Sequence, residues 1–189
     1  MKKIMFNDAY ALTQAVLDGR KTQTRRIVPQ STIDKYSLME DFTIIDDARY
    51  NVGEVAAVAQ SYNDCGYGEC APIVSLDENG IAAFGSDAGS YNKMFVKADL
   101  MPHRIRITDV RVERLNDISE SDIKAEGIDY VNGYSESYFF GFGVKAEKGW
   151  IKLGNTPREA YAALIDKISG EGTWESNPYV FAYTFELMK

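Results

Sequence analysis

Gly19-Arg20-Lys21-Thr22-Gln23-Thr24-Arg25-Arg26-Ile27-Val28 is the stretch around which the rest of this chain is organised. It places four cations and two hydroxyl groups within seven residues. Apolar residues at helical spacing before it predict a helix at about 8–18, and Gly19 is suited to end that helix. Pro29 ends the extended run that follows. The stretch therefore joins a helix to a strand and brings polar side chains to the junction.

The composition is that of one globular domain, which we assign to residues 1–189. The net charge of −7 argues against a protein that coats duplex DNA by neutralising its phosphates. No apolar run approaches the ~18 residues needed to cross a membrane. Because the N-terminal residues also lack the apolar core of a signal peptide, we expect a cytoplasmic protein with no membrane partner. The oligomeric state does not follow from the sequence.

A metal centre is not expected. Cys65, Cys70 and the single histidine, His103, supply three candidate ligands at most, and they lack the spacing of a four-ligand zinc site. We read the cysteines as loop thiols in a reducing compartment, and we predict neither a metal nor another cofactor.

Outside the opening stretch, the pattern alternates irregularly between strands and helices. Residues 30–50 read as irregular, with a short strand at 42–45, and residues 129–154 read as a loop with short extended pieces. A hairpin is predicted at 73–84 within a long loop. The remaining expected elements are strands at 3–6, 55–59, 104–114 and 179–187, and helices at about 119–126 and 157–169. This order predicts an α+β fold on a mixed or antiparallel sheet that forms a small β-barrel with flanking helices.

Local signals add detail to these elements. Ser119 and Thr156 are the expected N-caps of the last two helices, and Asp122 can answer Ser119 from the third helical position. Tyr161 belongs to the apolar stripe of the second of these helices. Along 104–114 we expect a bulge or a change of the buried face near Asp109, and along 179–187 aromatic residues alternate.

Lys21, Thr24 and Glu126 are the residues that could carry chemistry. A hydroxyl needs a neighbouring base before it can attack a carbonyl, and lysine can serve if its pKa falls. The arginines beside Lys21 would lower its pKa, and Glu126, at the end of a helix, is suited to hold and donate a proton. In a regular strand Lys21 and Thr24 point to opposite faces, so they converge only if a turn follows Gly19. From spacing alone, a basic surface strand explains the same residues.

Arginines and tyrosines supply further candidate contacts. Phosphate binding and ion pairing with the surplus carboxylates both fit the arginines, which are Arg20, Arg25, Arg26, Arg104 and Arg106. Tyr62, Tyr67 and Tyr91 could stack on a base, although ordinary loop packing explains them equally.

Five ordered segments resemble the ASCH (activating-signal-cointegrator homology) domain family, and are most similar to its phage and prophage members. They are Gly19–Arg26, Val52–Val55, Met101-Pro102 leading into Arg104–Leu115, Ile118–Ile128, and Trp174–Val180 with the final strand. The similarity spans nearly the whole chain and leaves about 61–100 and 129–155 as variable insertions.

The resemblance implies a PUA-like β-barrel with flanking helices and a cleft for RNA or nucleotides, here built around Lys21, Thr24 and Glu126. One branch of the family is an amidohydrolase that deacetylates N4-acetylcytidine. Its motif falls on Gly19–Thr24, which implies Lys21 as the base, Thr24 as the nucleophile and Glu126 as the proton donor.

One departure bears on the substrate. Phage-type relatives carry an arginine–glutamate pair after the buried strand, and here Ala59-Gln60 stands in that place, followed by Ser61 and Tyr62. Three functions therefore remain open from the sequence. They are a nucleotide- or RNA-binding domain, an amidohydrolase acting on N4-acylated cytidine, and a phage accessory module that binds another protein through its aromatic insertion.

Overall fold

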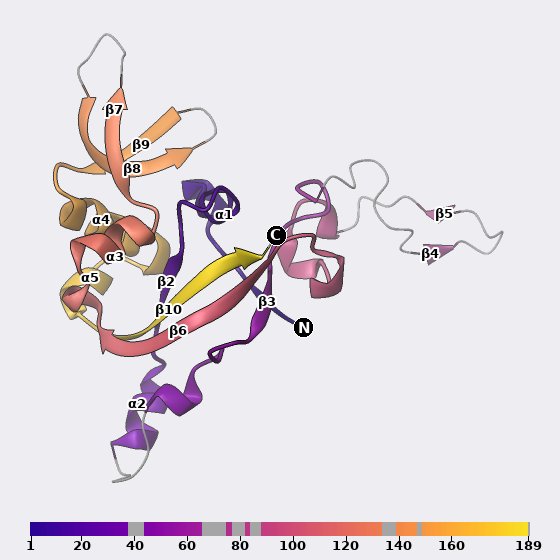
Figure 1. Ribbon diagram of the computed structural model, residues 1–189, viewed down its shortest axis with the longest axis horizontal. Helices are drawn as coiled ribbons and strands as arrows, with labels where there is room; N and C mark the ends of the chain where they lie inside the picture. Colours follow the sequence, from indigo (N-terminus) through magenta and orange to yellow (C-terminus); the bar gives the residue numbers. More distant parts are fainter. Residues whose placement is uncertain are drawn as a thin grey trace. The chain divides into compact units, whose positions relative to one another are not determined.

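The computed structural model describes residues 1–37, 44–65, 75–76, 82–83, 88–133, 139–146 and 149–188. They form two compact units (Figure 1). The first unit consists of Met1–Phe6, Val55–Ile105 and Met188–Lys189, and the second of Asn7–Glu54 and Arg106–Leu187.

The first unit is built on the buried strand β3 (Val55–Val58). β1 (Lys2–Ile4) pairs with it in parallel, so that Ile4 lies opposite Val58. The Val58 N–H donates to the carbonyl of His103 at 2.9 Å, just before β6 (Arg104–Arg114) begins. These contacts confirm the strand predicted at 55–59. β4 (Ser75–Leu76) and β5 (Ala82–Ala83) pair antiparallel, which confirms the predicted hairpin at these four residues, while its other residues lie outside the described part.

In the second unit, β10 (Tyr179–Met188) lies between β6 and β2 (Gln23–Ile27). β2 is antiparallel to β10, with Thr24 opposite Tyr183. The alternating aromatic residues predicted for β10 are buried at positions 181, 183 and 185. On β6 the buried positions change from odd to even numbers near Asp109, as the sequence predicted. This change leaves a polar row on β6 at Asp109, Arg111 and Glu113.

The predicted closed barrel is wrong for the described residues. Hydrogen bonds order the strands as β1-β3-β6 in the first unit and β6-β10-β2 in the second, and neither series closes on itself. The observed class is a mixed α+β fold with open sheets.

The observed helices match the predicted ones where the sequence contains a strong N-cap residue. α3 (Glu120–Ala125) follows the N-cap Ser119, and α4 (Pro157–Ser169) follows the N-cap Thr156, as predicted. The helix predicted at 8–18 is interrupted because Ala11 has φ of 50°, which separates the 3₁₀ turn η1 (Asp8–Tyr10) from α1 (Leu12–Leu17).

The sequence missed two α-helices and misassigned one short segment. α2 (Gln30–Tyr36) occupies part of the region predicted to be irregular, and α5 (Thr173–Ser176) was not predicted. Ile44 and Ile45 belong to the 3₁₀ helix η2 (Ile44–Asp47) rather than to a strand, and positions 42–43 lie outside the described residues. Further 3₁₀ turns are η4 (Ala88–Ser90), η5 (Lys93–Phe95), η6 (Ala98–Leu100) and η7 (Leu115–Asp117).

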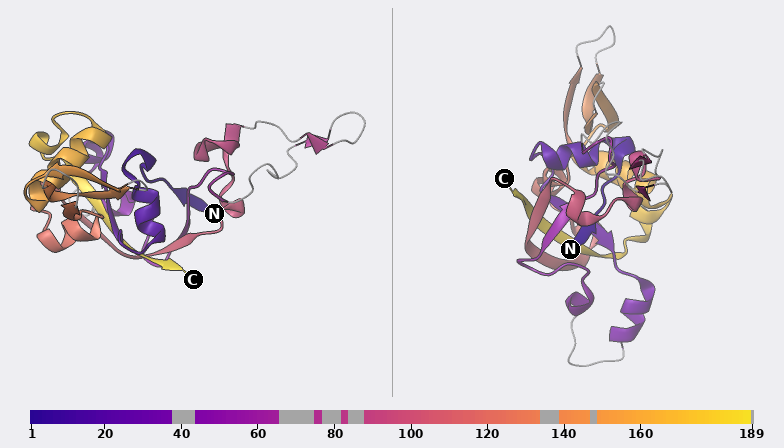
Figure 2. Two further views of the ribbon diagram at one scale, coloured as in Figure 1. Left: turned by 90° about the horizontal axis from the view of Figure 1, so that it is seen from above. Right: turned by 90° about the vertical axis from the view of Figure 1, so that its right-hand side faces the viewer.

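The segment predicted to be a loop at 129–154 is a three-stranded antiparallel sheet. Its strands are β7 (Asp129–Gly133), β8 (Phe139–Ala146) and β9 (Gly149–Gly154). Glycines interrupted the period-two signal because close packing requires them. A Cβ on Gly143 would lie 1.9 Å from the Ile151 carbonyl oxygen, and one on Gly154 would lie 2.5 Å from the Ala160 nitrogen. Figure 2 shows this sheet and α2 at opposite ends of the second unit. None of the helices in the described ranges is long and apolar enough to cross a membrane.

Candidate functional site

Alternate residues of β2 present polar side chains to one side. The Gln23 amide donates to Asp122 Oδ1 at 3.0 Å, and the Arg25 guanidinium donates to Asp122 Oδ2 at 3.0 Å. Lys21 lies just before the strand and reaches Glu126, the C-cap of the helix that carries Asp122 in its first turn. A turn at Gly19, where φ is +72°, positions Lys21, and the Lys21 N–H donates to the Ala15 carbonyl at 2.9 Å.

α3 supplies the two carboxylates that meet these side chains. Asp122 and Glu126 are four residues apart, so they lie on one face of the helix. The Asp122 N–H donates to Ser119 Oγ at 3.1 Å, which fixes the start of the helix. The sequence suggested that the Asp122 carboxylate would return this cap, but it accepts hydrogen bonds from β2 instead.

The Lys21–Glu126 ion pair joins residues 105 positions apart. Lys21 Nζ lies 2.5 Å from Glu126 Oε2 and 2.9 Å from the Glu126 carbonyl oxygen. Lys21 is 2% exposed and Glu126 is 4% exposed. Burial lowers the pKa of Lys21 from its ordinary value, and the Glu126 carboxylate opposes this shift only in part. The charged form of Lys21 thus depends on its partner.

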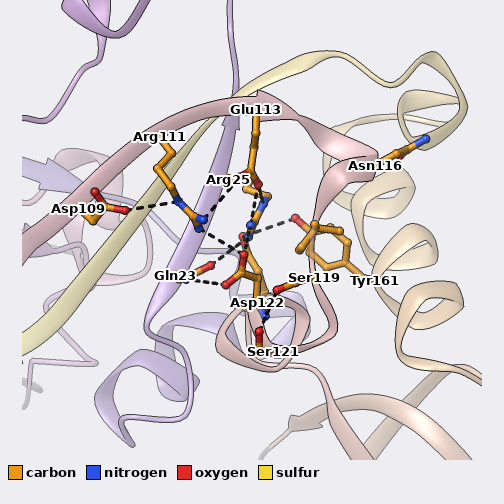
Figure 3. Close-up of polar contacts among 12 residues, drawn as sticks. Gln23, Arg25, Asp109, Arg111, Glu113, Asn116, Ser119, Ser121, Asp122 and Tyr161 are labelled. Atoms are coloured by element: carbon orange, nitrogen blue, oxygen red, sulfur yellow. Dashed lines mark hydrogen bonds and ion pairs between the residues drawn. The ribbon is translucent and has the colours of Figure 1, made fainter.

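Arg25 connects this pair to two further carboxylates, as Figure 3 shows in part. Its guanidinium donates to Glu126 Oε1 at 3.1 Å, to Glu113 Oε1 at 2.8 Å, and to Asp122 Oδ2. Arg111 adds a second guanidinium, 3.3 Å from Asp122 Oδ2. We refer to the whole set as the ion-pair cluster, which comprises Lys21, Gln23, Arg25, Arg111, Glu113, Asp122 and Glu126.

The charges of the ion-pair cluster balance. Its three cations face three carboxylates, and Arg111 also pairs with Asp109 at 3.4 Å, so the cluster has no excess positive charge that would attract a bare phosphate. Burial alone would raise the pKa of Asp122, but the hydrogen bond from Gln23 and the charges of Arg25 and Arg111 hold that pKa below its ordinary value. Asp122 therefore remains an ionised acceptor at neutral pH.

Tyr161, on α4, closes one side of the cluster. Its hydroxyl lies 3.5 Å from Glu126 Oε1, and the residue is fully buried. Burial and the nearby Glu126 carboxylate raise the pKa of Tyr161 well above its ordinary value, so it remains a neutral donor.

Solvent exposure differs among the side chains of the cluster. The Arg111 side chain is 43% exposed, Asp122 is 18% exposed and Glu113 is 17% exposed, whereas Lys21 and Arg25 are almost wholly covered. The open edge of the cluster is therefore formed by Arg111, Glu113 and Asp122, with the Lys21–Glu126 pair behind it.

Thr24 lies in a different position from the other two predicted catalytic residues. Because Gln23 and Arg25 both face Asp122, the strand alternation turns Thr24 to the opposite face of β2. Thr24 is 5% exposed, and its strand neighbour is Tyr183. The structure brings Lys21 and Glu126 together and directs Thr24 away from them.

The predicted arginine contacts are similarly divided. Arg25 belongs to the ion-pair cluster, whereas Arg26 is exposed on the next position of β2. Arg20 pairs with Asp18 at 2.8 Å, and Arg106 is 3.5 Å from Glu186. Arg104 is exposed in the first unit. Phosphate binding by these residues remains a prediction.

The aromatic residues of the long insertion differ in exposure. Tyr62 is buried, and a Cβ on Gly89 would lie 2.5 Å from its ring, so Tyr62 packs within the first unit. Tyr91 is 85% exposed, and Tyr67 lies outside the described residues. Gln60 is buried with its Oε1 atom 2.7 Å from His103 Nδ1.

Sequence reasoning missed Gln23, Glu113, Asp122, Arg111 and Tyr161 as members of the site. A usable signal was present for the first four. Polar residues recur at every second position before and along β2 and along β6, and two carboxylates recur at helical spacing on α3. Tyr161 gave no such signal, because it looked like part of the apolar stripe of α4. Within the described ranges, no group of three or more His, Cys, Asp or Glu residues could hold a metal ion.

Comparisons with known proteins give only distant structural neighbours. No family model matches the chain, and no curated protein matches it. A crystal structure of a DUF984 family protein from Enterococcus faecalis V583 aligns with 14% identity and a TM-score of 0.43, over 100% of this chain and 80% of that one. The ASCH domain structure from Lactobacillus crispatus JV V101 aligns with 11% identity and a TM-score of 0.42, over 98% of this chain and 77% of that one. Because both TM-scores are below 0.5, we base no assignment on them.

Proposed function

We propose that this protein binds a nucleoside, either free or within single-stranded RNA, at the open edge of the ion-pair cluster. The observation that carries the proposal is the buried Lys21–Glu126 pair held behind a partly exposed carboxylate and guanidinium. Buried ionisable groups with shifted pKa values and specific charge partners are concentrated at functional sites.

The chemistry of the open edge favours a nucleobase. Asp122 presents carboxylate oxygens and Arg111 presents guanidinium N–H groups, 3.3 Å apart at their closest. A carboxylate accepts from the exocyclic amine of cytosine, and a guanidinium donates to ring nitrogens and carbonyl oxygens. Such a mixed edge suits a neutral base better than a phosphate, because the cluster has no excess positive charge. The sequence resemblance to the ASCH family independently implies a nucleotide or RNA ligand.

Calorimetric titration with the four nucleosides and with short single-stranded RNA tests this proposal. We expect saturable binding of at least one nucleoside. Asp122→Asn should weaken it at least about tenfold, which is the loss of one charged hydrogen bond. Lys21→Met should also weaken it, because it removes the buried partner of Glu126 behind the open edge. Glu120→Gln and Lys124→Met are matched controls, because both residues are exposed on α3. The absence of saturable binding of both nucleosides and short RNA, or equal losses in the control variants, would refute the proposal.

Deacylation of an N4-acylated cytidine is the second candidate function. The observation that favours it is the lowered pKa of Lys21, together with a carboxylate at 2.5 Å, since a base must lose its proton to act. Thr24 faces away from Lys21, so direct attack by Thr24 requires residues 22–24 to rearrange.

Incubation of the protein with N4-acetylcytidine decides whether it is a deacylase. A hydrolase produces equal amounts of cytidine and acetate, and Lys21→Met abolishes the reaction. Turnover that persists in Lys21→Met, or no turnover in the native protein, would exclude this function and leave nucleoside binding unaffected.

A further inference from the structure

The inner residues of the ion-pair cluster already use their hydrogen-bonding groups on one another. Arg25 donates through Nε to Glu113, through Nη1 to Gln23 and Glu126, and through Nη2 to Asp122. Both carboxylate oxygens of Glu126 also accept hydrogen bonds, one from Lys21 and one from Arg25. A ligand that reaches the cluster therefore contacts the open edge.

One carboxylate oxygen of Glu113 is held in place without accepting a hydrogen bond from the described residues. The other oxygen, Oε1, accepts from Arg25 Nε at 2.8 Å, which fixes the direction of the carboxylate. Arg111 Nη1 lies 3.9 Å from Oε2, which is too far for a hydrogen bond. Glu113 Oε2 is therefore an oriented acceptor at the open edge.

Arg111 is held more loosely than Arg25. Among the described residues it makes one hydrogen bond, from Nη2 to Asp122 Oδ2 at 3.3 Å, and its Nε lies 3.4 Å from Asp109 Oδ2. The N–H groups of Nη1 can therefore donate to a ligand.

The open edge presents an acceptor, a donor and an acceptor in that order. The Nη1 atom of Arg111 is the one toward Glu113, and its Nη2 atom is the one toward Asp122. Figure 3 shows Arg111 and Glu113 extending from β6 toward Asp122 on α3. Because the guanidinium lies between two carboxylates, the complementary ligand edge has an acceptor in the middle and no carbonyl oxygen on either side.

Adenine is the RNA base whose pairing edge fits this order. It presents an exocyclic amine, then a ring nitrogen that accepts, then a C–H group. Cytosine has a carbonyl where adenine has the C–H group. Uracil and guanine have an N–H group where the guanidinium needs an acceptor, and both carry a carbonyl beside it. A carbonyl oxygen opposite Glu113 or Asp122 repels the carboxylate and leaves it unpaired, which weakens binding.

We propose that the open edge selects adenine, with Glu113 Oε2 accepting from the exocyclic amine and Arg111 donating to the adjacent ring nitrogen. Glu113 is then the residue that determines base specificity. This inference rests on the proposed function and names the base that it takes. It applies to adenosine and to an unpaired adenine in RNA alike, because these contacts lie on the base.

Calorimetric titration with a series of ribonucleosides tests this inference on the native protein. Adenosine should bind about tenfold more tightly than purine riboside, which lacks the amine, because one hydrogen bond to a charged group is lost. The riboside of 2,6-diaminopurine carries a second amine in place of the C–H group, opposite Asp122, and should bind at least as tightly as adenosine. Cytidine, guanosine and uridine should each bind at least about tenfold more weakly than adenosine.

Glu113→Gln tests the residue itself. If Arg25 keeps the amide oxygen, an NH₂ donor replaces Oε2, so the ratio of the purine riboside to the adenosine dissociation constant should fall from about ten to about one. Because both constants are measured on the same variant, a general loss of affinity cancels in this ratio. Glu120→Gln is the matched control, since Glu120 is an exposed acid on α3, and it should keep the ratio near ten. Circular dichroism checks that both variants retain their secondary structure.

The failure of this inference is distinguishable from the failure of the proposed function. If uridine, guanosine or purine riboside binds as tightly as adenosine, or the ratio survives Glu113→Gln, selection of adenine by Glu113 is refuted and nucleoside binding stands. An equal fall of the ratio in Glu120→Gln also refutes it. If neither nucleosides nor short RNA bind, the proposed function fails, and this inference fails with it. Should Glu113→Gln not fold, the nucleoside series on the native protein decides.

Discussion

Removing one partner of the Lys21–Glu126 pair should destabilise the second unit by an amount that depends on which partner is removed. Glu126→Gln leaves the Lys21 ammonium buried without its carboxylate. Breaking a buried pair in this way costs about 3–5 kcal/mol. A lysine can instead lose its proton, which costs about 1.4 kcal/mol for each pH unit below its ordinary pKa, or about 4.6 kcal/mol at pH 7. The two estimates agree, so we expect a loss of about 3–5 kcal/mol for Glu126→Gln.

Lys21→Met should cost less. Glu126 then keeps the Arg25 guanidinium at 3.1 Å and the Tyr161 hydroxyl at 3.5 Å, so its charge is not left unpaired. We expect a loss of about 1–2 kcal/mol, since the hydrogen bonds from Lys21 to the Glu126 carboxylate and carbonyl are removed while an apolar side chain fills the space. In the Lys21→Met background, Glu126→Gln should also cost only about 1–2 kcal/mol, which gives a coupling energy of about 2 kcal/mol.

Urea unfolding followed by tryptophan fluorescence measures these values. Trp150 and Trp174 both belong to the second unit, so the signal reports on the unit that contains the pair. The reasoning would be refuted if Lys21→Met were as costly as Glu126→Gln, or if the two losses were additive in the double variant.

Three further effects follow from the same contacts. Because burial lowers the folded-state pKa of Lys21, the unfolded chain binds more protons at Lys21 than the folded chain does. The native protein should therefore gain stability relative to Lys21→Met as the pH rises toward about 10.4. Urea unfolding of both proteins from pH 7 to 10 measures this gain, and their stabilities would change in parallel if the pKa of Lys21 were ordinary. Ser119→Ala should cost about 1 kcal/mol in thermal unfolding by removing the N-cap of α3, whereas Ser121→Ala, which removes only an exposed contact with Ser119 Oγ at 2.9 Å, should cost less. Gly143→Ala should cost about 2 kcal/mol, because its Cβ would lie 1.9 Å from the Ile151 carbonyl oxygen, and an unchanged urea midpoint would contradict this contact.

The parts of the fold predicted from sequence are those with strong local signals. The N-caps Ser119 and Thr156 identified α3 and α4, and the alternation along 104–114 identified β6 together with the change of its buried face. These patterns depend on residues only a few positions apart, and the folded chain keeps the local structure that they predict. The β7–β9 sheet was missed because glycines required by close strand packing replaced the side chains that would have shown the alternation.

The barrel was predicted incorrectly because closure depends on pairing between distant strands. The local sequence of β1 or β2 does not indicate which strand pairs with it, since long-range packing sets both the register and the neighbouring strand. The helix break at Ala11 was missed for a related reason. Nothing in the local sequence favours φ of 50° for an alanine, and the surrounding structure imposes it.

For the candidate site, the sequence indicated Lys21 and Glu126, and the structure brings them within 2.5 Å. The sequence did not indicate which other residues surround this pair. Arg25 was considered as a phosphate contact, yet three carboxylates surround it, and Asp122 was considered only as a capping residue. Such networks depend on which faces of β2, β6 and α3 meet, which periodicity alone does not specify.

The central claim is that a nucleoside binds beside the Lys21–Glu126 pair, and the NMR signal of the Lys21 side chain during a nucleoside titration tests it most directly. With ¹³C-labelled lysine, the Lys21 ¹³Cε resonance should shift and saturate with the dissociation constant found by calorimetry. The exposed Lys124 resonance should not shift, which makes it the internal reference. A Lys21 resonance that stays unchanged while the nucleoside binds would contradict the account, because the ligand would then occupy another part of the protein.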